Sequence, residues 1–188
     1  MKKIIGWVIF FVWPALGFAS VPAWEIIPSE SQLTFTATQN DAPVSGEFKH
    51  FSGEIAVDPQ NLNDSHIKIV VDINSISTSY SDLTLTLNSP DWFNSKMFPQ
   101  AVFVSDKILS TGDKTYAVKG TLTIRDKSIP ITLTVVEDSN TGDKARIHGN
   151  TMLSRTAFSV GQGEWASTDE VKDNVIVNFI VSAVKQAK

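Results

Sequence analysis

The sequence has 188 residues, of which 16 are Lys or Arg, 20 are Asp or Glu and 3 are His, and it contains no Cys. This length suits one domain with a substantial core and is short for two. The missing cysteines exclude structural disulfides, a thiol nucleophile, thiolate metal ligands and the acylated Cys of bacterial lipoproteins. The net charge of −4 argues against a nucleic-acid partner, because phosphate binding requires a basic surface.

The first residues have the composition of a targeting segment. Lys2 and Lys3 are followed by a largely apolar run over residues 4–18, and small residues come next. This order is typical of a secretory signal peptide. The apolar run is shorter than the roughly 20 residues that cross a bilayer. We therefore predict that the segment is removed and that no integral membrane segment is left after processing.

Two cleavage sites satisfy the small-residue pattern of signal peptides. One follows Ala19 and the other follows Ala23, and the sequence leaves both open. We predict a signal peptide within residues 1–23 and one mature domain over residues 24–188. Loss of the two lysines leaves 14 basic against 20 acidic residues, which changes the net charge from −4 to −6.

Beyond residue 23 the chain mostly alternates apolar and polar residues, which is the period of a half-buried strand. About eight such segments follow one another, separated by turn-like clusters such as residues 138–144. An antiparallel sheet of this size has two edges to protect, and closure into a barrel removes both. We predict an all-β fold, an antiparallel eight-stranded barrel. The apolar positions placed on its inner face include Leu33, Phe35, Ala37, Ile67, Ile69, Val71, Tyr116, Val118, Leu122, Ile124, Ile129, Ile131, Leu133, Val135, Ala145, Ile147, Leu153, Val175, Val177, Phe179 and Val181.

The segment 44–57 contains a change of parity. Its apolar residues shift from one alternation to the other between Phe48 and Phe51. An extra residue near His50, beside Gly53, is typical of a β-bulge that bends a strand round a barrel corner. The alternative is a simple break between two strands, and the sheet bends here in either case.

Residues 80–93 fit two kinds of structure. Leu83, Leu85 and Leu87 alternate as in a strand, whereas Tyr80, Leu83 and Leu87 also share one helical face. The period alone slightly favours a strand.

Four aromatic side chains crowd residues 89–103, a segment otherwise composed like a surface connection: Trp92, Phe93, Phe98 and Phe103. Rings at the entry to a new strand can close the end of a barrel while their backbone stays at the surface. Neighbouring residues share an apolar side only in a helical turn, because successive side chains of a strand point to opposite faces. We interpret the rings as the rim or lid of a cavity, with a purely stabilising plug as the alternative.

The size of the inward side chains decides whether such a barrel is hollow. Five small residues leave room for an apolar guest: Ala37, Gly46, Gly120, Gly149 and Thr151. In the alternative, the large residues Phe35, Phe48 and Tyr116 fill these gaps, because core and cavity linings share composition.

Sequence motifs for catalysis or metal binding are lacking. His50, His66 and His148 are far apart without an HExxH arrangement, so a metal site would need convergence in space. The segment 159–163 has too few glycines and basic residues for a phosphate-binding loop. We predict no catalytic residue, no metal site and no required cofactor.

Four separated segments of the chain resemble the YceI-like family. They read GEFKHFSGEI (46–55), SPDWF followed by MFPQAVF (89–103), VKGTLTIRDKSIPITL (118–133) and LSRTAFSVGQGEW (153–165). This family comprises bacterial periplasmic proteins with a lipocalin-like barrel, and its members bind polyisoprenoid chains such as isoprenoid quinones. The resemblance covers nearly all of the mature chain in order, and it is specific because four blocks agree.

The resemblance implies a periplasmic location and a long apolar tunnel that holds an isoprenoid lipid or quinone. It also implies a short helical connection around residues 80–93 near the tunnel opening, against the period of the leucines. The residues that we expect to contact the ligand are Phe35, Phe48, Phe51, Trp92, Phe93, Phe98, Phe103, Leu122, Leu133, Leu153, Arg155 and Phe158.

The chain departs from the family pattern at one end of the barrel. Where many members carry an Arg-Asp pair, this chain has Leu83 and Thr84, and Trp92 takes the place of the first Phe of a family motif. We therefore expect different polar contacts there, and with them a different head group. Arg155 matches the family block, and its cation is expected to meet a quinone oxygen or an internal carboxylate.

Three functions follow as hypotheses. The first is a periplasmic binding or carrier protein that holds an isoprenoid lipid without chemical change. The second is a lipid-modifying enzyme that would need Arg155, Glu164 or a histidine at the cavity. The third is a β-sandwich interaction module with a packed core.

The C-terminal strand has a second apolar side. Ile176 and Ile180 lie on the opposite parity from the inward residues of this strand. Such a two-sided strand is typical of a homodimer interface or of a face covered by a helix.

Overall fold

The computed structural model describes residues 21–187, and the predicted signal peptide lies largely outside them. Within the described residues the chain is mostly strand, with one α-helix, α1 (Ser81–Asn88), and short 3-10 turns. The strands are β1 (Ala23–Ile26), β2 (Gln32–Gln39), β3 (Ala42–Phe48), β4 (Phe51–Ala56), β5 (His66–Asp72), β6 (Ile76–Thr78), β7 (Gln100–Gly112), β8 (Thr115–Ile124), β9 (Lys127–Asn140), β10 (Lys144–Ser154) and β11 (Asn174–Lys185).

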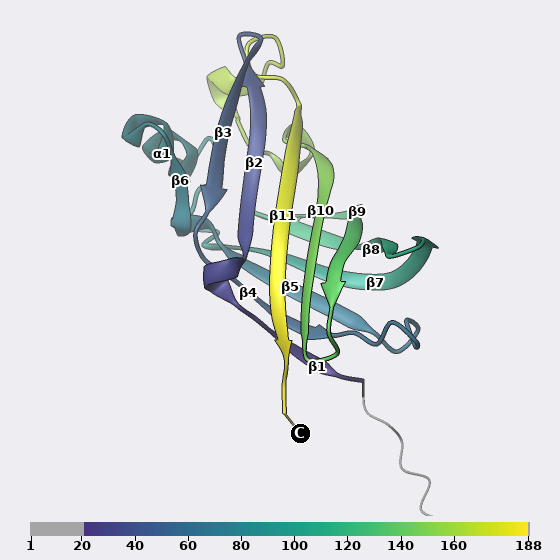
Figure 1. Ribbon diagram of the computed structural model, residues 1–188. Coiled ribbons are helices and arrows are strands. Elements are labelled where there is room, and N and C mark those ends of the chain that lie inside the picture. Colours follow the sequence, from purple (N-terminus) through teal and green to yellow (C-terminus); the bar gives the residue numbers. More distant parts are fainter. Residues whose placement is uncertain (1–20, 188) are drawn as a thin grey trace, which may run out of the picture.

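Eight of these strands form a closed antiparallel ring in the order β1, β4, β5, β7, β8, β9, β10, β11. The ring closes because β1 pairs with β4 on one side and with β11 on the other, where Trp24 lies opposite Lys185. The strands are strongly coiled, so that β11 and β10 run steeply across β7 and β8 in Figure 1. The prediction of an eight-stranded antiparallel barrel is confirmed.

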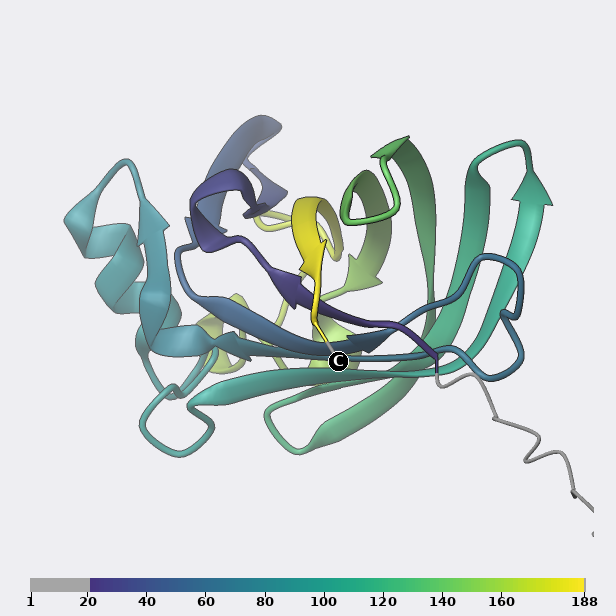
Figure 2. The same ribbon diagram turned by 60° about the horizontal axis from the view of Figure 1, so that its bottom comes forward.

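Strand β11 is shared between two neighbours. Its residues 176–180 pair with β2, and its residues 183–185 pair with β1. From β2 the sheet continues through β3 to β6, so these three strands extend the wall beyond the ring. Figure 2 shows α1 and β6 together at one end of the molecule, while the turn between β7 and β8 lies at the other end.

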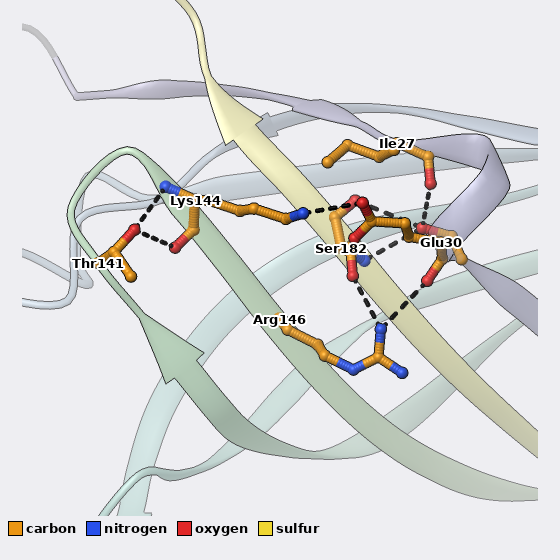
Figure 3. A network of polar contacts seen from close by, with 7 residues as sticks. Ile27, Glu30, Thr141, Lys144, Arg146 and Ser182 are labelled. Carbon is orange, nitrogen blue, oxygen red and sulfur yellow. Dashed lines mark hydrogen bonds and ion pairs between the residues drawn. The ribbon is translucent and has the colours of Figure 1, made fainter.

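A polar network fixes the point where β11 changes partner (Figure 3). Ser182, which is fully buried, accepts a hydrogen bond from the Arg146 guanidinium at its hydroxyl (3.1 Å) and one from the backbone N–H of Ile27 at its carbonyl (2.8 Å). Lys144 forms an ion pair with Glu30, a residue of the 3-10 turn η1 (Pro28–Glu30), at 2.8 Å. These contacts join β10, β11 and the connection between β1 and β2. They therefore stabilise the point at which β11 changes its pairing partner from β2 to β1.

The change of parity in residues 44–57 is a break between two strands. Strand β3 ends at Phe48 and pairs with β2 and β6, whereas β4 begins at Phe51 and pairs with β5 and β1. The β-bulge interpretation is therefore wrong. The two residues between the strands allow the chain to turn from the wall extension into the ring.

The segment 80–93 contains a helix. The family resemblance implied this helix, whereas the alternation of the leucines slightly favoured a strand. Helix α1 places Leu83 and Leu87 on the side facing the barrel, while Leu85 is exposed. The two inward leucines are four residues apart, which places them on the same face of the helix. The hydroxyl of Thr84 accepts a hydrogen bond from the backbone N–H of Thr78 at 3.2 Å, which ties the helix to β6.

The second side of β11 carries exposed apolar residues. Ile176 pairs with Met152 of β10, and both side chains are exposed. Helix α1 lies away from β11 (Figure 1), and the exposure of both side chains shows that no helix covers them. The homodimer remains a prediction.

Candidate ligand cavity

The barrel encloses a cavity of about 390 Å³, within the range of small-molecule binding sites. Its lining is almost entirely aliphatic and aromatic, and the apolar strand residues predicted to face inward lie on it, with the exception of Ile129. Polar side chains on the lining are few: Gln39, Thr86, Tyr116, Glu137, Asn140, Thr151 and Arg155. The site therefore provides a water-excluding surface with little chemistry.

The structure brings together eleven of the twelve side chains predicted to contact a ligand. These lining residues are Phe35, Phe48, Phe51, Trp92, Phe93, Phe103, Leu122, Leu133, Leu153, Arg155 and Phe158. Phe98 is not part of the lining. The chain turns back after Asn94, whose carbonyl accepts the N–H of Phe98, and the Phe98 ring lies 5.7 Å from the Arg125 guanidinium instead.

The inward glycines do not leave the open space expected of them. A Cβ atom on Gly46 would lie 2.5 Å from Cζ of Phe35, and one on Gly120 would lie 2.6 Å from Cζ of Phe103. Each glycine is thus covered by a phenyl ring from the neighbouring strand. The rings fill the space beside the glycines but lie against the barrel wall, so the cavity remains open. The structure therefore matches neither alternative: the glycines leave no gaps, and the large side chains do not fill the barrel.

Aromatic side chains shut one end of the cavity, here called the closed end. Trp92 is 92% buried (8% exposed) and packs against Trp165 at 5.6 Å between ring centroids. Phe93 meets Phe48 edge to face at 6.0 Å. Trp92 and Phe93 follow α1 in a run of turns, so both reach the cavity. This arrangement agrees with a rim or lid, and it stabilises the barrel end as well.

Arg155 lies at the closed end, and its side chain is hydrogen-bonded to backbone carbonyl groups. It is 4% exposed and donates hydrogen bonds of 2.8–3.2 Å to five carbonyls, those of Val160, Gly161, Ser167, Val171 and Lys172. Burial lowers the pKa of the guanidinium, while the charge of Asp173 opposes this change. The side chain donates to these carbonyls and not to a carboxylate, so the expectation of an internal carboxylate partner is wrong.

The other end of the cavity, here called the open end, reaches the surface. Pro59 and Asn140 line the cavity and are exposed, whereas the lining residues at the closed end are buried or half-buried. Tyr116 and Glu137 line the cavity beside them. Asn140 donates a hydrogen bond to the Glu137 carboxylate at 3.2 Å. Burial is the largest cause that raises the pKa of the Tyr116 hydroxyl, and the charges of Glu137 and Asp113 add to it.

Several lining residues were missed by the sequence reasoning. Pro59 and Leu62 come from the connection between β4 and β5, whose composition is that of a loop. Trp165 lies in another connection, within the 3-10 turn η4 (Gly163–Trp165). Glu137 lies near the end of β9, where the apolar alternation has ended. Alternation identifies strand residues that face inward, but it carries no information about loops that fold over an opening.

The ionisable residues proposed for catalysis do not gather at the cavity. His50, His66, His148 and Glu164 are exposed and do not line it. Among residues 21–187, no group of three or more His, Asp or Glu side chains is placed to hold a metal ion. No helix in this part of the chain combines the length and apolarity needed to cross a membrane.

A sequence profile of the YceI-like domain matches residues 24–183 of the chain. A UPF0312 protein of Vibrio campbellii is 28% identical over 122 residues, which are 62% of this chain and 65% of that protein. A UPF0312 protein of Photorhabdus laumondii is 33% identical over 88 residues, 47% of this chain and 45% of that protein. The chain thus spans less than two thirds of the length of these relatives.

Solved structures share the fold. BcnA of Burkholderia cenocepacia is 31% identical, with a TM-score of 0.81 over 85% of this chain and 99% of that protein. A polyisoprenoid binding domain from Saccharophagus degradans is 14% identical, with a TM-score of 0.70 over 88% and 99% of the two chains. A Campylobacter jejuni YCEI protein is 24% identical, with a TM-score of 0.66 over 78% and 87%.

Proposed function

The chain belongs to the YceI-like family, and on that premise we propose that it is a periplasmic carrier that holds an isoprenoid lipid, such as an isoprenoid quinone. The observation that carries the proposal is the apolar cavity inside the barrel, closed by aromatic rings at one end and open at the other. The shared fold with a polyisoprenoid binding domain supports the same class of ligand.

The lining supplies the driving force for such a ligand. Burial of apolar surface contributes about 25 cal/mol per Å², so a prenyl chain that buries on the order of 400 Å² gains about 10 kcal/mol before the costs of association. An unsaturated hydrocarbon chain makes no hydrogen bonds, so it matches a lining with few polar groups. A polar ligand of the same size would lose its hydration without compensation.

The enzymatic alternative lacks support at the site. Of the residues that it required, Arg155 alone lines the cavity, and its donors are used by backbone carbonyls. Glu164 and the three histidines are exposed outside the lining. A general acid or base must reach the proton that it transfers, and none of these four residues does so within the cavity.

The proposal is tested by extracting lipid from protein purified after export from a bacterial host. Mass spectrometry of an organic extract should find a prenyl lipid in stoichiometric amount, and native mass spectrometry should report the same added mass. Protein that refolds fully but takes up neither the host's lipids nor an added prenyl quinone would contradict the proposal.

A matched pair of variants separates the cavity from the rest of the surface. Val177 faces the cavity from β11, and its neighbour Asn178 is exposed. Val177→Trp places an indole in the lumen and should abolish lipid retention, while Asn178→Trp should retain lipid as the wild type does. Circular dichroism shows whether both variants keep the barrel.

A further inference from the structure

The open end differs from the rest of the cavity in its charge. Glu137 is the one carboxylate among the described lining residues, and the one lining cation, Arg155, is held by carbonyls at the closed end. Tyr116 and Asn140 stand beside Glu137. The polar groups at this opening are thus a carboxylate, a phenol and an amide.

The lysines of the neighbouring turns do not neutralise this opening. The carbonyl of Lys114 accepts the backbone N–H of Glu137 at 2.8 Å, but the side chain of Lys114 is exposed and does not line the cavity. Lys144 is paired with Glu30 at 2.8 Å, on the outside of the barrel. The charge of Asp113 acts on Tyr116 together with that of Glu137, so the local charge at the opening is negative.

We propose, resting on the function proposed above, that Glu137 and Tyr116 select lipids whose head group is uncharged and carries a hydroxyl, and that they disfavour prenyl phosphates. With the chain in the apolar lumen, the head group lies at the open end. A hydroxyl donates a hydrogen bond to the Glu137 carboxylate and accepts one from the Tyr116 phenol. Prenols, prenylated phenols and the reduced form of a prenyl quinone belong to this class.

A phosphate head group meets the opposite situation. It brings up to two negative charges, and its recognition in proteins depends on Arg or Lys at bonding distance. At this opening it would face a carboxylate with no lining cation to pair with it. The repulsion between like charges a few ångströms apart and half removed from water is sufficient to lower affinity about tenfold or more.

The experiment compares geranylgeraniol with geranylgeranyl monophosphate, which share one hydrocarbon chain, by titration below their aggregation limits at pH 8. The wild-type protein should bind the alcohol at least about tenfold more tightly. Glu137→Gln keeps the shape and removes the charge, so the preference should fall severalfold through tighter binding of the phosphate. Glu25→Gln is the matched control, because Glu25 is exposed on β1 between two buried residues, and it should leave the preference unchanged.

Tyr116→Phe gives a second test that does not depend on Glu137. It should weaken binding of the alcohol about two- to tenfold, the worth of one hydrogen bond, with little change for the phosphate. Equal affinity of the wild type for the two lipids, or an unchanged preference in Glu137→Gln, overturns the head-group inference and leaves the carrier function standing. Failure to bind either lipid overturns the carrier function itself.

Discussion

Phe179 of β11 and Gly149 of β10 lie directly opposite each other in the barrel wall, and a Cβ atom on Gly149 would be 2.4 Å from Cζ of the phenyl ring. The ring covers the glycine in place of a side chain. Phe35 covers Gly46, which is its direct partner, in the same way, and Phe103 covers Gly120 from a diagonal position on the neighbouring strand. Because a glycine lets the opposing ring lie flat, three large side chains are accommodated without crossing the lumen.

Gly46→Ala should therefore reduce both stability and lipid capacity. The added methyl group would lie 2.5 Å from Cζ of Phe35 and 2.9 Å from the carbonyl oxygen of Ser77. Because the backbone carbonyl on one side cannot yield easily, the Phe35 ring would be pushed toward the lumen. Overpacking of this kind costs about 1–3 kcal/mol in the free energy of unfolding. Urea denaturation measures the loss, and mass spectrometry measures the bound lipid.

The neighbouring Ser45 supplies the control for this substitution. Its side chain is exposed on the outer face of β3. Ser45→Ala should change the unfolding free energy by no more than about 0.5 kcal/mol. Equal effects of the two substitutions would show that the covering of Gly46 by Phe35 does not matter.

Arg155→Met should be strongly destabilising. The substitution leaves five backbone carbonyls at the closed end without their donor, and buried unsatisfied acceptors cost about 1–3 kcal/mol each where water cannot replace the donor. We expect a loss of at least about 3 kcal/mol by urea denaturation.

Arg155→Lys should lie between the wild type and Arg155→Met, because an ammonium has three donors at one point and cannot reach carbonyls on several sides. Gly161 gives independent support for the tight fit, since a Cβ atom there would lie 2.3 Å from Nη1 of Arg155. Wild-type stability in either variant would mean that the carbonyls find other donors.

Stability should fall in acid partly through Asp173. Burial alone would raise the pKa of this carboxyl, but hydrogen bonds from Ser154 and Thr156 and the charge of Arg155 outweigh burial and lower it. A carboxyl with a depressed pKa in the folded state adds stability that is present above its unfolded value, near 3.8. This stability is lost as the pH falls below about 4 through the folded pKa.

Asp173→Asn should be less stable than the wild type at pH 7, and the difference should shrink between about pH 4 and pH 2. Urea midpoints at several pH values measure it. Asp106→Asn, a change at an exposed carboxyl, serves as the comparison. A difference between Asp173→Asn and the wild type that stays constant with pH would contradict the role assigned to this carboxyl.

Processing after Ala19 is the cleavage that leaves β1 intact. The carbonyl of Pro22 accepts the N–H of Val57 at 3.1 Å, and that of Ala23 accepts the N–H of Gln186 at 2.9 Å. Cleavage after Ala23 would remove both acceptors. We predict that the protein released from the periplasm by osmotic shock begins at Ser20, which intact-mass measurement decides. A mature chain that begins at Trp24, or retention in the cytoplasm, would contradict this prediction.

The sequence was sufficient to predict the longer strands and most of the lining because alternation is a local property, but the short strands β1 and β6 were not among the predicted segments. Val175, Val177, Phe179 and Val181 all line the cavity as their parity required. The helix at residues 81–88 could not be predicted from the spacing of its apolar residues, because its three leucines fit the alternation of a strand equally well. Only the comparison of whole segments with a family favoured a helix.

The parts that escaped prediction depend on contacts between distant segments. Nothing local to Gly46 indicates that the ring of Phe35 covers it. The five acceptors of Arg155 come from residues 160–172, so the use of its donors could not be read from the residue itself. Glu137 lies beyond the apolar alternation of its strand, but β9 continues to Asn140 and carries Glu137 to the rim of the cavity.

The pairing of β11 with both β2 and β1 also determines when the barrel can close. Because the ring is completed by residues 183–185 against β1, a chain that lacks these last residues has no enclosed interior. Contacts between segments so far apart in sequence form late and slowly. An enclosed interior is therefore a property of the full-length chain, and it forms only when the last strand pairs with the first.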